Sequence, residues 1–197
     1  MKSLAIEREY GSGGREIGIK VAEKLGIPYY DSKELLKAAD RYGISINELL
    51  DCEKNGNGNF MEDLSRAANF IKDRDTSEFY RSLSGTTEII KRLKEEGTAV
   101  FIGRCSTEVL KYRPDIIRVF IYSSNEKKKI RNIIRTEQVS EEKAQFLLKK
   151  KDGNRKNYFR FFTNKDWRDR NNYDMELNTD MISSEECVDL LAYMMTK

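Results

Sequence analysis

Short apolar segments alternate with longer amphipathic ones along most of the chain. Five short, mostly apolar runs predict strands at 3–7, 27–30, 98–102, 118–122 and 173–178. Apolar residues repeated at helical spacing predict helices at 15–25, from Ser32 onward, at 60–74, 77–96, 106–112 and 126–135, from Ser140 toward Asp152, and over the last residues. Strands that alternate with helices indicate an α/β fold whose parallel sheet is covered on both faces.

Local signals mark several helix ends. Gly26 and Gly97 stand where the first helix and the 77–96 helix should stop. A serine followed three residues later by glutamate is the pattern of a capping box. It occurs at three predicted helix starts: Ser45 with Glu48, Ser123 with Glu126, and Ser183 with Glu186. The polar turn at 53–59 has too little chain before it for a second core, so we expect a single domain over residues 1–197.

A glycine-rich turn follows the first predicted strand. Its residues are Arg8-Glu9-Tyr10-Gly11-Ser12-Gly13-Gly14, and Arg15 opens the next helix. Glycines let backbone amides surround an anion, and the helix N-terminus adds partial positive charge. The segment is therefore a candidate phosphate loop, with a plain strand-to-helix turn as the alternative. It is not a Walker loop, because Gly14 stands where Lys belongs and Arg15 where Ser or Thr belongs.

The same glycines also suggest a dinucleotide site, because Asp31 lies 20 residues after Gly11. The G-x-G-x-x-G pattern fails, however, since Glu16 stands at its last glycine. The second strand is also very short for a ribose-binding edge, so a nicotinamide or flavin site is the weaker interpretation.

Composition narrows the chemistry. The 197 residues include 36 Lys and Arg against 33 Asp and Glu, and no apolar run approaches the roughly 18 residues that suggest a membrane span. The chain becomes acidic already at Glu7, whereas a signal peptide would continue with an apolar segment there. The three cysteines share no close spacing, so we expect a cytoplasmic, reduced protein. The chain has no histidine, so any catalysis has to use carboxylates, Arg, Lys, hydroxyls, thiols or a metal.

Residues 149–170 form the most basic stretch, with nine Lys and Arg residues against three Asp and with interleaved aromatic residues. Three interpretations stay open: a lid that closes over phosphates, a solvated helix whose aromatic side chains pack inward, or a nucleic-acid surface. The even balance of charge elsewhere argues against nucleic acid as the partner.

Further residues extend the pattern beyond the loop. Asp31-Ser32 follows the second strand, Gly103-Arg104 follows the 98–102 strand, and Asp152 and Arg155 lie in the basic stretch. In this order they resemble cytidylate kinase and its nucleoside monophosphate kinase relatives, and most of all the cytidylate kinase-like branch. The resemblance covers nearly the whole chain. It implies a P-loop kinase-type three-layer α/β fold with a five-stranded parallel sheet, a helical acceptor-binding insert near 32–96 and a basic lid near 149–170.

The resemblance also implies roles for individual residues, with ATP and Mg²⁺ as cofactors. The nucleotide phosphates would contact Arg8, Gly11, Ser12, Gly13, Gly14 and Arg15. The acceptor would contact Asp31, Ser32, Lys37, Arg104, Asp152 and Arg155. The candidate catalytic residues are Arg15, Arg104, Asp152 and Arg155.

Departures from the family pattern concern charge and metal. The loop lysine and its hydroxyl neighbour are missing, Ile102 replaces an acid, and Cys105 replaces an Asp, which weakens the case for cytosine as the acceptor base. Phosphoryl transfer depends on neutralising charge across the phosphates. Arg15 is our first choice to replace the lysine and Arg8 the second, while Arg15 paired to a nearby carboxylate is the alternative. A metal would need Glu7, Ser12 or Asp31, and all three remain candidates.

Several side chains have competing structural explanations. Asp31 suits a site and a helix N-cap equally well. Arg104 follows a core strand directly, which favours ligand contact over a structural ion pair. A buried, inert thiol is the favoured interpretation of Cys105 over an activated one, and Trp167 is expected to be a packing anchor.

The favoured function is an ATP-dependent phosphotransferase that acts on a nucleoside monophosphate or another small phosphorylated or hydroxyl acceptor. The alternative is a nucleotide-binding protein that keeps the fold and the phosphate cradle without kinase activity. No membrane partner is expected in either case.

Overall fold

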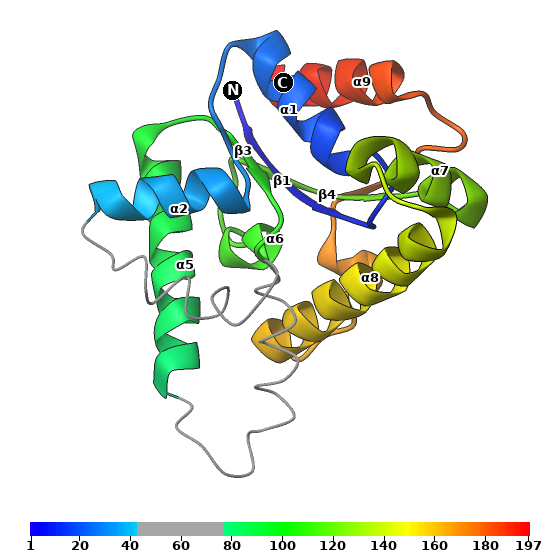
Figure 1. Cartoon of the computed structure of the whole chain (residues 1–197). Helices are drawn as coiled ribbons and strands as arrows, with labels where there is room; N and C mark the ends of the chain where they lie inside the picture. The colour runs from blue at the N-terminus through cyan, green and yellow to red at the C-terminus, as the bar shows by residue number, and fades with distance from the viewer. Residues whose placement is uncertain (43–76) are drawn as a thin grey trace.

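The computed structural model describes residues 1–42 and 77–197, and the statements below concern these residues. Five parallel strands at its centre have the order β2-β3-β1-β4-β5 (Figure 1). The strands are β1 (Ser3–Arg8), β2 (Tyr29–Tyr30), β3 (Val100–Ile102), β4 (Ile116–Tyr122) and β5 (Met175–Asn178). Because every pairing is parallel, the carboxyl ends of the strands meet at one edge of the sheet.

Helices cover both faces of this sheet (Figure 1). One face carries α1 (Gly14–Leu25) and α9 (Ser184–Thr196), and the other carries α2 (Ser32–Arg41), α5 (Ser77–Glu96) and α6 (Ser106–Val109). In β1, Leu4 and Ile6 pack into the first layer and Ala5 into the second, as the alternation of strand side chains requires. The predicted three-layer α/β fold with a five-stranded parallel sheet is confirmed.

The helices α7 (Glu126–Glu137) and α8 (Glu141–Thr163) pack against each other beyond the end of β4. A separate buried cluster joins the end of α8 to the sheet: Cys105, Phe120, Tyr158, Phe159, Trp167 and Tyr173. Trp167 is only 1% exposed and meets the Phe120 ring edge-on at 5.1 Å between centroids. The aromatic residues of the basic stretch therefore pack inward, and Trp167 is a packing anchor as expected.

Several predicted helix ends are confirmed and one is wrong. The bounds of α5 agree with the prediction, and Ser183 and Glu186 form a complete capping box at α9. The cap of α7 is Asn125, whose side chain accepts the Lys128 N–H, and not Ser123. Ser123 is unavailable because its hydroxyl contacts the carboxylate of Asp180, at 2.9 Å.

Two other element boundaries differ from the predicted ones, one because of a proline and one because of tertiary packing. The second strand is only Tyr29–Tyr30, since Pro28 has no N–H to donate. The helix that begins after Ser140 does not stop near Asp152 but continues to Thr163, where its aromatic side chains enter the buried cluster. The predicted turn at 53–59, the capping box at Ser45 and the helix at 60–74 lie outside the described residues.

Within residues 1–42 and 77–197, none of the helices combines the length and apolar composition that a membrane crossing requires.

Candidate functional site

The connection between β1 and α1 forms a tightly held loop. Gly11 and Gly13 have φ of 76° and 85°, in the left-handed region that favours glycine. A Cβ on Gly11 would lie 2.6 Å from the carbonyl oxygen of Lys129, so the loop backbone lies directly against α7. Two side chains from outside the loop hold its carbonyls: Asn132 donates to the oxygen of Gly11 at 2.8 Å and Thr179 to that of Ser12 at 3.0 Å.

The loop and the start of α1 present backbone amides to a cavity of about 540 Å³. Among the described residues, no acceptor is bonded to the amides of Gly11, Gly13, Arg15 and Glu16. The positive end of the α1 dipole lies at the same place. The cavity is further lined by Arg8, Asp31, Ser32, Lys33, Asn132, Arg135, Lys151 and Arg155. The arrangement suits an anion with several oxygen atoms.

Arg8 takes the space that a phosphate-loop lysine would need. A Cβ on Gly14 would lie 2.7 Å from the Cβ of Arg8, and a Cβ on Gly103 would lie 2.0 Å from its Nη1. The side chain of Arg8 therefore runs through a channel that exists because both positions are glycine. Any side chain at position 14 would collide with the Cβ of Arg8, so a lysine does not fit there with this backbone.

The guanidinium of Arg8 is short of negative partners. Burial and, after it, the neighbouring charge of Arg155 together lower its pKa to about 9, although Glu7 and Asp31 oppose the shift. Its buried Nε has no hydrogen-bond partner among the described residues. Arg155 donates from Nη1 to the carbonyl oxygen of Arg8 at 3.0 Å, so the two cations are close neighbours. Such a pair is electrostatically costly until an anion lies between them.

Arg15 is paired with Asp31. Its Nε and Nη2 donate to Oδ2 of Asp31 at 3.0 and 2.6 Å, while Oδ1 accepts the N–H groups of Lys33 and Glu34 at the start of α2. Burial alone would raise the pKa of Asp31, but the Glu34 amide and the Arg15 guanidinium outweigh it and lower the pKa. Asp31 is thus the N-cap of α2, which was one of the two interpretations of this residue. Arg15 is paired with a carboxylate, which was the alternative to its contact with phosphates.

The turn after β3 is held in a strained conformation. Gly103, Arg104 and Cys105 follow one another with φ of 80°, 59° and 54°. A non-glycine residue in this region costs on the order of 1–3 kcal/mol and persists only where neighbours enforce it. The Cys105 N–H donates to Oε1 of Glu7 at 3.1 Å, and Arg104 Nε donates to the Ser32 hydroxyl at 2.9 Å. The turn therefore brings Arg104 and Ser32 together beside the cavity.

Glu7 is a positioning residue that the sequence indicated only as a metal candidate. Its carboxylate is buried and accepts both the Cys105 N–H and Nε1 of Trp167, the latter at 3.3 Å. Burial raises the pKa of Glu7, and Arg8 is the main charge that opposes this. Burial raises the pKa of the neighbouring Cys105 thiol well above its ordinary value, which favours an inert thiol, as expected.

Helix α8 holds the first residues of the loop. The Tyr10 N–H donates to Oδ1 of Asp152 at 2.7 Å, and the Tyr10 ring lies beneath the cations of Lys151 and Arg155, at 4.7 and 5.4 Å. Burial raises the pKa of Asp152 to about 6, although Arg155, 3.7 Å away, opposes the shift. Asp152 and Arg155 thus contact the phosphate loop, to which the resemblance had not assigned them.

Glu9 is a second anchor that sequence analysis missed. Its buried carboxylate contacts Lys129 Nζ at 2.8 Å and Arg168 Nη2 at 2.6 Å. These partners come from α7 and from the segment after α8, so their proximity to Glu9 depends on the tertiary fold. Nor does any local pattern indicate Asn132 or Thr179, which hold the loop carbonyls.

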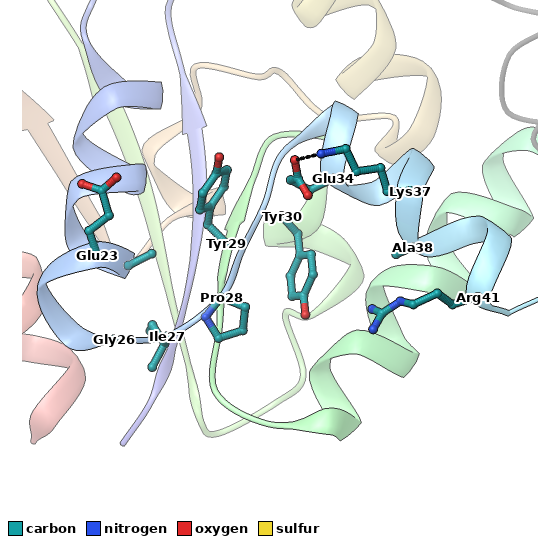
Figure 2. Close-up of a pocket in the computed structure, with 11 residues that line it drawn as sticks. Glu23, Gly26, Ile27, Pro28, Tyr29, Tyr30, Glu34, Lys37, Ala38 and Arg41 are labelled. Atoms are coloured by element: carbon teal, nitrogen blue, oxygen red, sulfur yellow. Dashed lines mark hydrogen bonds and ion pairs between the residues drawn. The ribbon is translucent and has the colours of Figure 1, made fainter.

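Lys37 is the one predicted site residue that lies elsewhere. It lines a second cavity of about 600 Å³ between the end of α1, β2 and α2, where Figure 2 shows its ammonium group directed at Glu34. The two side chains are 2.8 Å apart, and 72% of the Lys37 side chain is exposed. The structure does not bring Lys37 to the cavity of the phosphate loop.

The described residues do not fit a resident Mg²⁺ ion. Both oxygens of Glu7 accept hydrogen bonds, both oxygens of Asp31 are engaged, and the Ser12 hydroxyl donates to the Glu9 carbonyl oxygen at 2.8 Å. No group of three or more potential metal ligands occurs within residues 1–42 and 77–197. The three candidate ligands therefore serve the protein itself.

Replacement of Glu7 tests its positioning role. In Glu7→Gln, the amide group faces the N–H donors of Cys105 and Trp167, so we expect a loss of about 1–3 kcal/mol in unfolding free energy. Trp167 is the only tryptophan in the chain, and its fluorescence emission should shift in the folded variant. Glu176→Gln, at an exposed position of β5, is the matched control. Unchanged stability and emission in Glu7→Gln would contradict the role.

Asp152→Asn tests the environment of the α8 carboxylate. The pKa of about 6 in the folded protein exceeds the value of about 3.9 in an unfolded chain. The stability that protonated Asp152 contributes is therefore present below about pH 4 and is lost as the pH rises through about 6. Asparagine keeps an acceptor for Tyr10, so the melting temperature of the variant relative to wild type should rise over this interval. A difference independent of pH would refute the assignment.

Comparisons with solved structures agree with the fold. A protein from Eubacterium ventriosum described as uncharacterized has a TM-score of 0.69 at 24% identity, covering 100% of this chain and 99% of that chain. Shikimate kinase from Acinetobacter baumannii, in complex with shikimate, has a TM-score of 0.51 at 15% identity, covering 100% and 93%. Shikimate kinase from Bacteroides thetaiotaomicron has a TM-score of 0.52 at 14% identity, covering 100% and 99%.

No curated protein matches the sequence significantly. A family model, however, matches nearly the whole chain, over residues 3–181, and includes the phosphate loop, the Gly103 turn and the basic helix. On this match, and with the P-loop kinase architecture described above, the chain belongs to the cytidylate kinase-like family.

Proposed function

We propose that this chain is a cytoplasmic, ATP-dependent phosphotransferase that acts on a nucleoside monophosphate or another small acceptor. The observation that carries the proposal is the channel between Gly14 and Gly103, which holds the cation of Arg8 beside the cavity that the loop glycines also line. Membership in the cytidylate kinase-like family supports kinase-type nucleotide binding.

In this proposal the donor phosphates bind the loop amides, with Arg8 and Arg155 neutralising their charge. Phosphoryl transfer is catalysed chiefly by positioning and by such charge stabilisation. Geometry favours Arg8 over Arg15 for this role, because Arg15 already forms a two-point contact with Asp31. Asp152 acts through the Tyr10 amide and is a positioning residue.

The acceptor is proposed to bind beside Arg104 and Ser32. Their contact places a cation and a hydroxyl at the carboxyl edge of the sheet, where an acceptor phosphate would meet the end of the donor. The family description favours a nucleoside monophosphate, while the shikimate bound to one structural neighbour makes a hydroxyl acceptor the other class to test. Residues 32–96 would form the acceptor insert and residues 149–170 a lid over the phosphates.

A non-catalytic nucleotide-binding protein is the second candidate. The occupied carboxylates of Glu7 and Asp31 and the absent loop lysine favour it. The two functions separate in a direct assay of ATP turnover against a panel of monophosphates and hydroxyl acceptors. ATP binding without transfer to any acceptor would favour the second candidate, and the absence of any nucleotide-induced rise in melting temperature would contradict both.

Replacement of the two loop arginines tests which of them meets the phosphates. Arg8→Gln removes a desolvated cation, so ATP affinity should fall by about tenfold to a hundredfold, corresponding to about 1.5–3 kcal/mol. Arg15→Gln loses the Asp31 contact, so it should lower the melting temperature more than it lowers ATP affinity. Calorimetric titration with ATP and thermal unfolding of both variants give the two quantities. A larger loss of ATP affinity in Arg15→Gln than in Arg8→Gln would indicate that Arg15 contacts the phosphates.

The channel that holds the Arg8 side chain can be tested by adding a methyl group at position 103. In Gly103→Ala the new Cβ would overlap the Arg8 guanidinium, the flexible end of a side chain, so the cation should be displaced while the fold survives. Gly26→Ala is the matched control, because Gly26 also has a positive φ, of 64°, but nothing lies within 4 Å of its Cβ position. Both variants should lose roughly 1 kcal/mol of stability, and only Gly103→Ala should lose ATP affinity. Equal affinities would contradict the channel.

A further inference from the structure

The charged groups around the phosphate-loop cavity are not evenly paired. All four acidic side chains that the described residues contribute to it already have cationic partners: Asp31 contacts Arg15, Glu9 contacts Lys129 and Arg168, Glu137 contacts Lys151 at 3.9 Å, and Glu16 contacts Arg135 at 3.8 Å. Arg8 has no carboxylate within ion-pair distance among the described residues, and Arg155 faces Asp152 only at 3.7 Å. The net charge presented to a ligand is therefore positive before any metal arrives.

The groups that hold Mg²⁺ in P-loop enzymes are either replaced in this sequence or engaged in hydrogen bonds within the protein. The ion normally binds a hydroxyl of the loop and a carboxylate at the end of a neighbouring strand. Here Arg15 occupies the position of that hydroxyl, and Ile102 ends β3 where the acid would stand. The nearest alternatives within residues 1–42 and 77–197 are Glu7 and Asp31, whose oxygens are occupied.

A divalent cation would also be repelled at this place. Arg155 donates to the main-chain carbonyl oxygen of Arg8 at 3.0 Å, and its charge lowers the pKa of the Arg8 guanidinium. A Mg²⁺ ion carried on the β- and γ-phosphates would add two further positive charges beside this pair of buried or half-buried cations. A metal-free polyphosphate would instead relieve the repulsion between the two guanidinium groups.

We propose that the phosphate loop binds its polyphosphate ligand as the metal-free anion, with Arg8 and Arg155 in the place of Mg²⁺. This inference rests on the proposed function, because it takes the loop to be the nucleotide phosphate site. It goes further by naming the ionic form of the ligand. It assigns to Arg8 the selection of the metal-free form of the ligand. The channel holds the Arg8 cation at the place where a metal complex of the ligand would bring its own cation.

The test is calorimetric titration of the full chain with ATP and with inorganic tripolyphosphate, each in excess EDTA or in excess MgCl₂. We expect both ligands to bind more weakly in MgCl₂, by about tenfold, because the metal competes for the same phosphate oxygens. Equal or tighter binding of the magnesium complex would overturn the inference and leave the proposed nucleotide site intact. If neither ligand binds in either condition, the phosphate site itself is wrong and both proposals fall.

Variants connect the preference to Arg8. Arg8→Gln should lose affinity for the metal-free ligands and retain more of its affinity for the magnesium complexes, so that the ratio between the two conditions falls toward one. Arg92→Gln removes a cation from α5, where Arg92 pairs with Glu88, and is the control that should keep the wild-type ratio. An unchanged ratio in Arg8→Gln would show that the preference does not come from this side chain and would overturn its assignment.

Discussion

The site depends on one steric constraint, the passage of the Arg8 side chain between two glycines. Gly14 opens α1, and Gly103 follows β3, on the other side of the channel. Because both lack a Cβ, a guanidinium can lie at the carboxyl edge of the sheet, where the helix dipole of α1 also points. A Cβ at position 14 would collide with the Cβ of Arg8, and a Cβ at position 103 would collide with its guanidinium. Positions 8 and 14 are thus fixed together with position 103, which is distant in sequence.

This constraint explains why the neighbouring carboxylates lie close to the buried cations and hold the surrounding backbone. A buried cation without an anion is unfavourable, and Glu7 and Asp152 lie near Arg8 and Arg155 as partial compensation. Glu7 also holds the strained turn at Cys105, and Asp152 also holds the Tyr10 amide. Each carboxylate therefore links the charge of the cavity to the backbone that shapes it, which leaves neither with a free oxygen for a metal.

Local signals in the sequence predicted the features that depend on neighbouring residues. The capping box of Ser183 and the bounds of α5 were predictable because their partners lie within one or two turns. Ser123 failed as a cap because its hydroxyl contacts Asp180, which lies 57 positions away. In the candidate site, the loop glycines and Arg104 could be found from sequence. The choice between Arg8 and Arg15 required two tertiary contacts that no periodicity encodes, of Arg15 with Asp31 and of Arg8 with Gly103.

Helix α8 shows how the fold combines rigidity with a charged surface. Its middle turns contact the phosphate loop through Asp152 and Arg155, and the turn that follows buries Tyr158 and Phe159 beside Trp167. Because a single continuous helix makes both sets of contacts, a movement of its charged end would disturb the aromatic cluster. Trp167 in turn donates to Glu7, which holds the turn that carries Arg104. The phosphate-loop side of the cavity and the Arg104 side are thus joined through one buried carboxylate, that of Glu7.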